Sequence, residues 1–167
     1  MSEDSAALVV LGIGSNKGDS PRIVRAAIAV LDTILGSMRC ASLYKTAPLY
    51  VLDQDYFFNT AVSGFYAHSP AVLLNTIHRL EASFGRDRSR ERRFGERTLD
   101  IDILLFGQQI CEEPLLTIPH PRLHERAFAL VPLLELIPDA VDPRTGIPLQ
   151  TILARLPEKE LAFAAER

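Results

Sequence analysis

Residues 97–106 read RTLDIDILLF, an apolar stretch interrupted by two aspartates at alternate positions. Because side chains alternate between the two faces of a β-strand, Asp100 and Asp102 are predicted to emerge on one face. The opposite face then carries the apolar side chains of Ile101, Ile103 and Leu105. The stretch therefore predicts a strand that is buried in a sheet and that presents two carboxylates side by side.

A pair of close, partly buried carboxylates needs compensating positive charge, because the two groups repel each other and resist ionisation. Oxygen ligands with no nearby His or Cys favour a hard cation, and Mg2+ held by one or two carboxylates and by phosphate oxygens is the usual arrangement. Asp100 and Asp102 are therefore candidate metal ligands. The alternative is that each aspartate pairs with an arginine at an exposed sheet edge, and an Asp-x-Asp pattern alone does not decide between the two.

Residues 85–97, directly before this strand, read GRDRSRERRFGER and contain six arginines in a chain whose net charge is -3. Arginine presents a planar fork of donors that matches phosphate oxygens, so the segment indicates a polyphosphate site such as that of ATP. One alternative is a solvated loop in which Asp87, Glu91 and Glu96 pair with the arginines. A nucleic-acid surface is less favoured, because Phe94 is the only aromatic residue in this segment and no recognition motif accompanies it. With a glycine near each end, we expect this loop to be open in the free protein and to close over bound substrates.

The segments around the strand predict helices and further strands. Apolar runs bounded by glycine and proline predict strands, and apolar side chains at spacings of three and four predict helices. The predicted strands are residues 8–14, 38–44, 57–66 and 99–106, the last pairing with 108–111 through a turn at Gly107. The predicted helices are residues 20–35 begun by Asp19, a helix from Ser69 to Gly85, and residues 127–136 and 149–156. This order predicts an α+β sandwich in which helices cover an antiparallel sheet.

The composition is that of a packed globular protein, with 167 residues, of which 47% are hydrophobic and 23% charged. A chain of this length predicts one domain over residues 1–167. No apolar run reaches the roughly 18 to 20 residues that span a bilayer, and Glu3 and Asp4 stand where a signal peptide would carry basic residues, so we expect a cytoplasmic protein. Cys40 and Cys111 stand alone and indicate neither a zinc site nor a disulfide framework.

The glycine-rich segment 11–19, LGIGSNKGD, does not match the common phosphate-binding loops. Lys17 stands where GxGxxG requires its third glycine, and no Walker lysine follows. We interpret the segment as a tight turn. If the protein uses ATP, the metal and the arginines must therefore position it.

Other residues fit both a structural and a functional explanation. Glu81 precedes the basic loop on a helix face that would normally be solvated, and His120 lies between two prolines that restrict its loop. Residues 44–49 and 57–59 could offer backbone groups, an amide and an aromatic wall to a flat heterocycle. Core packing explains these aromatic residues equally well.

Taken in order, five segments of the chain resemble the 6-hydroxymethyl-7,8-dihydropterin pyrophosphokinase family. The resemblance extends from Leu8 to about Pro138 and is most specific in the RTLDIDILLFG block and the IPHP block that follows it. The segments are LGIGSNKGD, YKTAPL, FFNTAV, LEASFGRDRSRERRFGERTLDIDILLFG and LTIPHPRLHERAFALVPLLEL.

The resemblance implies a ferredoxin-like three-layer α/β/α sandwich with a mainly antiparallel central sheet. The implied reaction is attack of the pterin hydroxymethyl oxygen on the β-phosphorus of ATP, with release of AMP, in folate biosynthesis. It also implies two Mg2+ ions, ATP as co-substrate and a reduced pterin as acceptor. We expect a monomer that has no nucleic-acid or membrane partner.

The same resemblance implies roles for individual residues. Asp100 and Asp102 would hold the metal ions, and Arg86 and Arg97 would contact the phosphates during transfer, so these four are the expected catalytic residues. Glu81 would help to organise the loop. The expected ATP-binding residues are Arg88, Ile103, Thr117, His120 and Arg126, and the expected pterin-binding residues are Thr46, Leu49, Phe57, Asn59 and Phe128.

Two other classes of protein stay open on the sequence alone. A ferredoxin-like nucleotide-sensing or RNA-binding module would use the basic loop without chemistry, and Asp100 and Asp102 would then be dispensable. A related pterin aldolase or a fused bifunctional protein is the second, although the chain lacks a further set of motifs.

Overall fold

The computed structural model describes residues 6–158 and 164–166, so Glu3 and Asp4 lie outside the described residues. None of the helices described is long and apolar enough to cross a membrane. The strands are β1 Ala7–Ser15, β2 Gly36–Cys40, β3 Leu43–Thr46, β4 Phe57–Tyr66, β5 Asp100–Phe106, β6 Cys111–Glu113, β7 Leu116–Ile118 and β8 Ala164–Glu166. The helices are α1 Ser20–Leu31, α2 Pro70–Ser83, α3 Ala127–Leu136 and α4 Leu149–Ala154, with a 3-10 turn at Leu123–Glu125 before α3.

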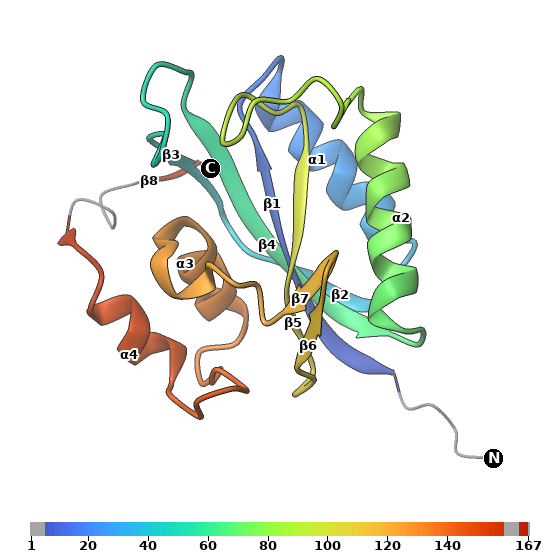
Figure 1. Ribbon diagram of the computed structural model, residues 1–167, viewed down its shortest axis with the longest axis vertical. Helices are drawn as coiled ribbons and strands as arrows, with labels where there is room; N and C mark the ends of the chain where they lie inside the picture. The colour runs from blue at the N-terminus through green and yellow to red at the C-terminus, as the bar shows by residue number, and fades with distance from the viewer. Residues whose placement is uncertain (1–5, 159–163, 167) are drawn as a thin grey trace.

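One antiparallel sheet organises the molecule (Figure 1). Its strand order is β5-β1-β4-β3-β8, and β2 also pairs with β4. β1 pairs with β4 along its whole length, from Ala7 opposite Tyr66 to Ser15 opposite Phe58. The strand with the two aspartates, β5, runs antiparallel to β1 on its other side.

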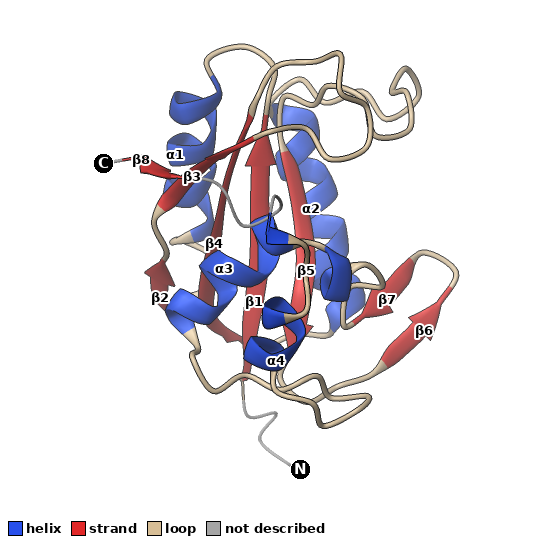
Figure 2. Cartoon of the chain, turned by 90° about the vertical axis from the view of Figure 1, so that its left-hand side faces the viewer, coloured by secondary structure: helices blue, strands red, loops and turns tan. Residues whose placement is uncertain are grey.

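Helices cover both faces of this sheet. Figure 2 shows α3 and α4 in front of the strands, with α1 and α2 behind them. The core beneath α1 and α2 is formed by side chains such as Val9, Leu11, Val24, Leu31, Leu73 and Ile77. The core beneath α3 and α4 is formed by side chains such as Val10, Ala61, Leu104, Leu130, Leu133 and Leu149. The three-layer α/β/α sandwich with a ferredoxin-like strand order is therefore confirmed.

The helices begin at the residues that the sequence indicated. Asp19 and Ser69 each accept a hydrogen bond from a backbone N–H in the first turn of α1 or α2, and a proline follows in each case. Such caps satisfy donors that the helix itself leaves unpaired. α3 has the predicted bounds. α1 ends at Leu31 instead of Leu35, because the Thr33 hydroxyl bonds back to a carbonyl of the last turn at 2.7 Å and the chain turns there.

Strand β5 alternates as predicted over Asp100–Ile103, with the aspartates toward α3 and the isoleucines in the core beneath α1 and α2. The register against β1 then shifts, so that Leu105 pairs with Val10 and Leu104 has no partner. This β-bulge reverses the side-chain alternation. Leu105 consequently packs in the core beneath α3, and the prediction that it shares a face with the two isoleucines is wrong.

Two predicted strands differ from those observed. Residues 38–44 form parts of β2 and β3 instead of one strand, and both pair with β4. Residues 108–111 do not pair with β5. Gly107 has a φ of 53° and donates its N–H to the Leu8 carbonyl of β1. The predicted turn is present and is closed by the Gln109 N–H, which donates to the Phe106 carbonyl at 3.0 Å. The chain then continues into a separate hairpin, in which Cys111 pairs with Ile118.

Candidate active site

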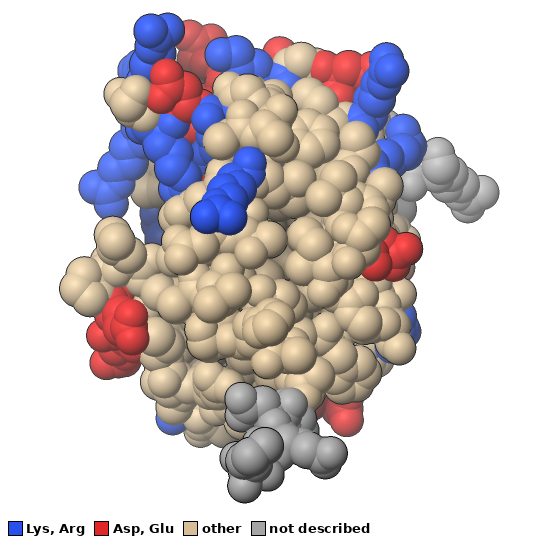
Figure 3. Space-filling model, turned by 90° about the vertical axis from the view of Figure 1, so that its right-hand side faces the viewer, with Lys and Arg blue, Asp and Glu red and all other residues tan. Residues whose placement is uncertain are grey.

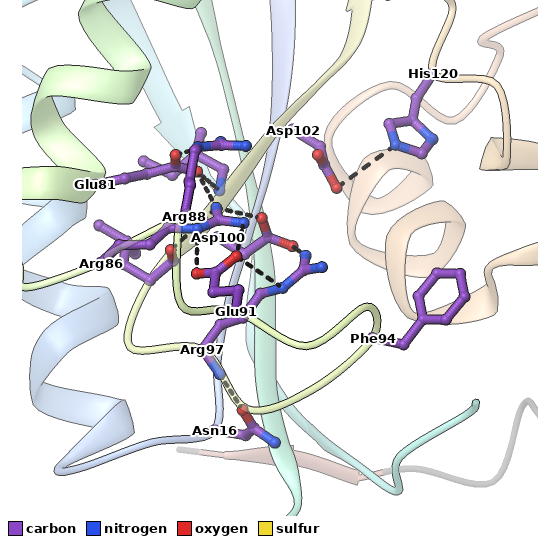
Figure 4. Close-up of polar contacts among 12 residues, drawn as sticks. Asn16, Glu81, Arg86, Arg88, Glu91, Phe94, Arg97, Asp100, Asp102 and His120 are labelled. Carbon is purple, nitrogen blue, oxygen red and sulfur yellow. Dashed lines mark hydrogen bonds and ion pairs between the residues drawn. The ribbon is translucent and has the colours of Figure 1, made fainter. Parts of the chain in front are cut away.

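Asp100 and Asp102 lie at the start of β5 and point away from α1, toward the end of the arginine loop and His120 (Figure 4). We use the name arginine loop for residues 85–97. The side chain of Asp100 is 20% exposed and that of Asp102 is 32% exposed. Both carboxylates are therefore shielded by the protein but remain open toward a cavity, as the alternation of side chains along the strand predicted.

The guanidinium group of Arg86 is buried among three carboxylates. It donates to Glu81 Oε1 and to Asp100 Oδ1 at 2.6 Å each, and to Glu91 Oε1 at 2.7 Å. The side chain of Glu81 is 1% exposed and also accepts from Arg88 at 2.6 Å and from the backbone N–H of the residue after Asp100 at 2.8 Å. Glu81 is thus not on a solvated helix face. The cluster fixes the start of the arginine loop to α2 and β5.

The two aspartates receive unequal compensation. Arg97 Nη1 donates to Asp100 Oδ2 at 2.5 Å, on the side away from Arg86. Burial alone would raise the pKa of Asp100, but the positive charges of Arg97 and Arg86 outweigh burial and hold the pKa below its ordinary value. Asp102 has a longer contact, with Arg126 Nη1 at 3.3 Å. Burial and the charge of Asp100 raise the pKa of Asp102 to about 7.

His120 approaches Asp102 with Nε2 at 3.7 Å from Oδ2. Burial and the charge of Arg126 lower the pKa of His120 to about 4, so the imidazole is neutral near pH 7 and the contact is not a salt bridge. Nδ1 accepts a hydrogen bond from the backbone N–H of Arg122 at 3.1 Å. The proton of the neutral ring is therefore on Nε2, which can donate toward the cavity.

A cavity lies between β4, α3, the segment after β3 and the end of the arginine loop. Its wall brings the two aspartates together with Arg97, Arg126 and the five residues expected to bind pterin, Thr46, Leu49, Phe57, Asn59 and Phe128. The amide of Asn59 is held by a hydrogen bond from Nδ2 to the Thr46 hydroxyl at 2.7 Å. A Cβ at Gly14 would lie 2.6 Å from Asn59 Oδ1, so only glycine leaves room for this amide.

Some of the expected residues do not line this cavity. Ile103 is 5% exposed and packs in the core beneath α1 and α2, and Thr117 lies on β7. Arg86 lines a second hollow, between the arginine loop and residues 51–54, instead of the cavity itself. Arg88 is half exposed and paired with Glu81. These four, and His120, whose Nε2 approaches Asp102, belong to the surroundings of the cavity and not to its wall.

The arginine loop gives one end of the molecule a basic surface. Figure 3 shows Lys and Arg side chains gathered toward the top of one face, the end at which this loop lies in Figure 1. Part of the charge is balanced within the loop, as the solvated-loop alternative expected, because Arg90 Nε is 3.4 Å from Asp87 Oδ2. The loop is not open, since the buried Arg86 and the stacked ring of Phe94 hold it against the body.

Asn16 and Gln54 are site residues that the sequence analysis missed. The Asn16 backbone N–H donates to the Arg97 carbonyl at 3.0 Å, and the Arg97 backbone N–H donates to Asn16 Oδ1 at 2.8 Å. Its Nδ2 donates to Gln54 Oε1 at 3.0 Å, and Gln54 Nε2 donates to the Phe94 carbonyl at 3.0 Å. The two amides therefore fix the end of the arginine loop. The only signal for Asn16 was its place in the tight turn after β1, and these contacts span up to 81 residues.

The cavity has free donors for an anion. Arg97 Nε and Arg126 Nε are buried and have no hydrogen-bond partner. Within residues 6–158, they are the only buried side-chain nitrogen or oxygen atoms of which this is true. Buried polar atoms normally have partners, and a guanidinium group pairs well with phosphate oxygens. Both residues line the wall that contains Asp100 and Asp102. The wall therefore suits an anionic ligand next to the carboxylates.

The carboxylate pair also fits a hard cation that is bound mainly through other oxygens. No cluster of three or more His, Cys, Asp or Glu that could hold a metal occurs among the described residues. A cation here would take two carboxylates from the chain and its remaining ligands from phosphate or water, which is the coordination that Mg2+ prefers.

Comparison with protein families gives one match that covers most of the chain. The family described as 7,8-dihydro-6-hydroxymethylpterin-pyrophosphokinase (HPPK) matches residues 10–138. The 2-amino-4-hydroxy-6-hydroxymethyldihydropteridine pyrophosphokinase of Synechocystis sp. is 40% identical over 139 residues, which are 82% of this chain and 70% of that protein. A folate synthesis bifunctional protein of Pisum sativum, described as mitochondrial, is 38% identical over 82% of this chain, but the match spans 26% of that longer protein.

Solved structures share the fold. The crystal structure of wild-type HPPK-DHPS of Plasmodium falciparum with pteroate has a TM-score of 0.70 and 15% sequence identity. The similarity covers 93% of this chain and 43% of that one. At this identity the likeness concerns the fold alone, so the chemistry of the site depends on the residues described above.

We predict that Asp102→Asn stabilises the metal-free protein at pH 8 and has little effect at pH 4.5. The folded-state pKa of about 7 exceeds the unfolded value of about 3.9. The folded state therefore binds this proton more tightly, and stability is lost as the pH rises from about 4 to about 7. An asparagine cannot ionise and avoids this loss.

Urea unfolding of wild type and variant at both pH values measures the effect. Asp139→Asn, which changes an exposed aspartate, is the control and is expected to be neutral at both. A gain from Asp102→Asn that is the same at pH 4.5 and pH 8 would contradict the assignment of the titration to Asp102.

Proposed function

The chain belongs to the 7,8-dihydro-6-hydroxymethylpterin-pyrophosphokinase family, and we infer that it catalyses pyrophosphoryl transfer from ATP to hydroxymethyldihydropterin in folate synthesis. We propose that Asp100, Asp102 and the guanidinium groups around them carry out this transfer. The observation that carries the proposal is the combination of two carboxylates and two unpaired guanidinium nitrogens on one wall of a cavity. An apolar wall with one buried amide lies opposite. The first wall suits a polyphosphate and the second suits a flat heterocycle.

The pterin half of the cavity is proposed to bind the acceptor through stacking and one amide. Phe57 and Phe128 would contact the two faces of the ring, since flat aromatic ligands gain most from contacts with their faces. Asn59 would hydrogen-bond the polar edge of the ring, and Thr46 and Leu49 would add backbone contacts. All five line the same cavity, which supports their joint assignment.

The phosphate half is proposed to use the free donors on the opposite wall. Arg97 and Arg126 would contact phosphate oxygens through Nε atoms that have no hydrogen-bond partner among the described residues, Arg97 Nε lying 3.9 Å from Glu91 Oε2. His120 would donate from Nε2. Arg88 would approach ATP from the half-exposed part of the loop. For the adenine, Ile103 and Thr117 would supply contacts near β5 and β7, partly through backbone groups, because the side chain of Ile103 is buried.

Arg86 is proposed to act in the transfer step while it also holds the site together. Its guanidinium is bound to Glu81, Glu91 and Asp100. A phosphate oxygen could replace the Glu91 carboxylate without disturbing Glu81, because Glu91 comes from the loop and is 18% exposed. Arg86 would then link the orientation of Asp100 to the presence of the nucleotide.

Asp100 and Asp102 are proposed to bind Mg2+, with two ions expected when ATP is present. The bound ions would neutralise charge on the triphosphate and on the carboxylates. The chain itself aligns the reactants. The pterin hydroxyl oxygen forms a bond to the β-phosphorus, and the bond from the β-phosphorus to the oxygen bridging to the α-phosphate breaks. AMP leaves, and the hydroxyl proton is released to solvent. Since the alcohol is uncharged and a weak nucleophile, alignment and charge neutralisation matter more than a strong base.

We further propose that residues 1–167 form one domain that acts as a monomer in the cytoplasm. The described residues form one six-stranded sheet with helices on both faces, and a separate two-stranded hairpin, β6-β7, follows β5 directly in the chain. This arrangement supports a single domain. The bifunctional relatives carry additional sequence beyond the matched region.

The direct test is incubation with ATP, Mg2+ and 6-hydroxymethyl-7,8-dihydropterin, followed by separation of the nucleotide products. AMP is expected in equal amount with pyrophosphorylated pterin, because the bond broken lies between the α- and β-phosphates. Formation of ADP would indicate single-phosphoryl transfer, and no nucleotide product at all would favour a binding module.

Replacing either aspartate tests the metal assignment. Asp100→Ala and Asp102→Ala are each expected to lower kcat by about a hundredfold or more, since each removes a group that holds charge against the triphosphate. Circular dichroism and a Mg2+ titration show whether the variants are folded and whether their Mg2+ requirement has moved. Near-normal Mg2+-dependent turnover in either variant would show that the assignment is wrong.

Arg97→Ala is expected to lower kcat by about a hundredfold and to change the pterin Kd by less than about threefold. The reason is that the phosphates gain charge at the oxygens that Arg97 faces as transfer proceeds. Steady-state kinetics and equilibrium binding of pterin measure the two effects, with Arg79→Ala on the exposed face of α2 as the control. A loss of pterin binding equal to the loss of kcat would indicate a structural role.

A further inference from the structure

Phe94, near the end of the arginine loop, has a backbone conformation that phenylalanine rarely adopts. Its φ is 59°, in the left-handed region that favours glycine. Such a conformation persists in a non-glycine residue only where surrounding contacts compensate for its cost. The contacts of the Phe94 side chain are therefore expected to stabilise this conformation.

One of these contacts is with the ring of Tyr50, from the segment after β3. The two ring centroids are 4.4 Å apart and the planes are inclined by 31°. Both rings line the cavity, together with Phe57, Asn59 and Phe128. The pair therefore forms part of the wall on the pterin side.

A guanidinium group from a third segment packs against both rings. The Cζ atom of Arg122 is 4.1 Å from the centroid of Tyr50 and 4.8 Å from that of Phe94, within the range of cation–π attraction. Arg122 also forms a salt bridge with Glu125 through Nε. The Tyr50 hydroxyl donates to the same carboxylate oxygen of Glu125 at 3.1 Å. Arg122 is thus held in place over both rings by a neighbour that also fixes Tyr50.

These contacts join three segments that are far apart in the sequence and that meet at the mouth of the cavity. Arg122 follows β7, Tyr50 follows β3, and Phe94 belongs to the arginine loop. The start of the loop is held independently, by the buried contacts of Arg86 with Glu81 and Asp100. Loss of the aromatic contacts would therefore loosen the end of the loop, which would then be held by the amides of Asn16 and Gln54, while its start stays attached.

We propose that Arg122 is a positioning residue that, with Tyr50 and Phe94, forms a cation–π latch holding the end of the arginine loop over the pterin side of the cavity. The proposal rests on the proposed function for its link to pterin, but the latch itself is a property of the chain. It determines how often the pterin side opens, and so how readily the pterin enters and its pyrophosphorylated product leaves. The phosphate side is less affected, because Arg86 is bound to Asp100, and Arg97 is bound to Asp100 and Asn16, through contacts that do not involve these rings.

The first test is amide hydrogen exchange of residues 92–96 in wild type and Arg122→Ala. Exchange in the variant is expected to be faster by about three- to tenfold, the effect of losing a partly exposed cation–π contact. Arg90→Ala is the matched control on the same loop, because its side chain is 87% exposed and contacts only Asp87 among the described ion pairs. Equal exchange in Arg122→Ala and Arg90→Ala would overturn the latch, whatever reaction the protein catalyses.

The second test measures steady-state AMP formation. In Arg122→Ala the KM for pterin is expected to rise by about three- to tenfold, while the KM for ATP changes by less than about twofold. Equal increases in both KM values would overturn the assignment to the pterin side. If wild type forms no AMP, the proposed function fails, and the exchange result still decides the latch.

Phe94 provides a variant pair that separates the latch from damage to the fold. Phe94→Trp keeps an aromatic face for Arg122 and is expected to retain wild-type exchange and pterin KM, whereas Phe94→Leu is expected to behave like Arg122→Ala. The double variant Arg122→Ala with Phe94→Leu is expected to lose less than the sum of the two single losses, because the residues act through one contact. Full additivity would overturn the proposal.

Discussion

Compensation of charge at the start of β5 is the constraint on which the site depends. A sheet strand covered on both faces carries two carboxylates two residues apart, and such groups cannot both be charged unless positive charge is close. Arg86 and Arg97 supply it to Asp100 from two sides, at 2.6 and 2.5 Å. Asp102 is left with one longer contact and a pKa of about 7. A cation bound beside Asp102, such as the proposed Mg2+, would favour the ionised carboxylate and lower this pKa.

The same compensation turns the arginine loop into a structural element. A loop of high charge with few apolar residues would be expected to be mobile, because it buries little surface. Here its start is fixed by the buried group of Arg86 with Glu81, and its end by Asn16 and by the ring of Phe94. Residues 87–90 and 92–93, between these anchors, stay exposed. The arginines therefore divide into those that hold the site together and those that are free to meet a ligand.

The local sequence pattern predicted those parts of the fold that depend only on residues close together in the sequence. The caps at Asp19 and Ser69 began helices where they were expected, and alternation placed Asp100 and Asp102 on one face. The pattern failed at Leu105, because a bulge is fixed by the register against β1 and not by the residues of β5 themselves. It also failed for the pairing of residues 108–111 with β5, because the chain after the turn at Gly107 leads into a separate hairpin in which Cys111 pairs with Ile118.

The site was predictable to the extent that it is local or shared with a known family. The resemblance named the five pterin residues, and the structure brings them into one cavity, while their roles remain proposals. It did not indicate that Asn16 would bond to the backbone of Arg97, or that Arg122 would lie over Tyr50. Such contacts join segments tens of residues apart, and no periodicity in the sequence encodes them.

The charged wall and the apolar wall of the cavity come from different layers of the molecule. Its carboxylates come from the sheet, whereas its apolar wall comes partly from α3, which carries Phe128, and from the end of β4 nearest the arginine loop. A reaction between a charged and a flat neutral substrate has to take place where these two walls meet. The arginine loop is the segment that touches both, since Arg97 bonds to Asp100 and Phe94 stacks on Tyr50 only three residues earlier. In the proposed mechanism, its position would determine the alignment of the two substrates, and contacts that hold its end would contribute to catalysis without touching the reacting atoms.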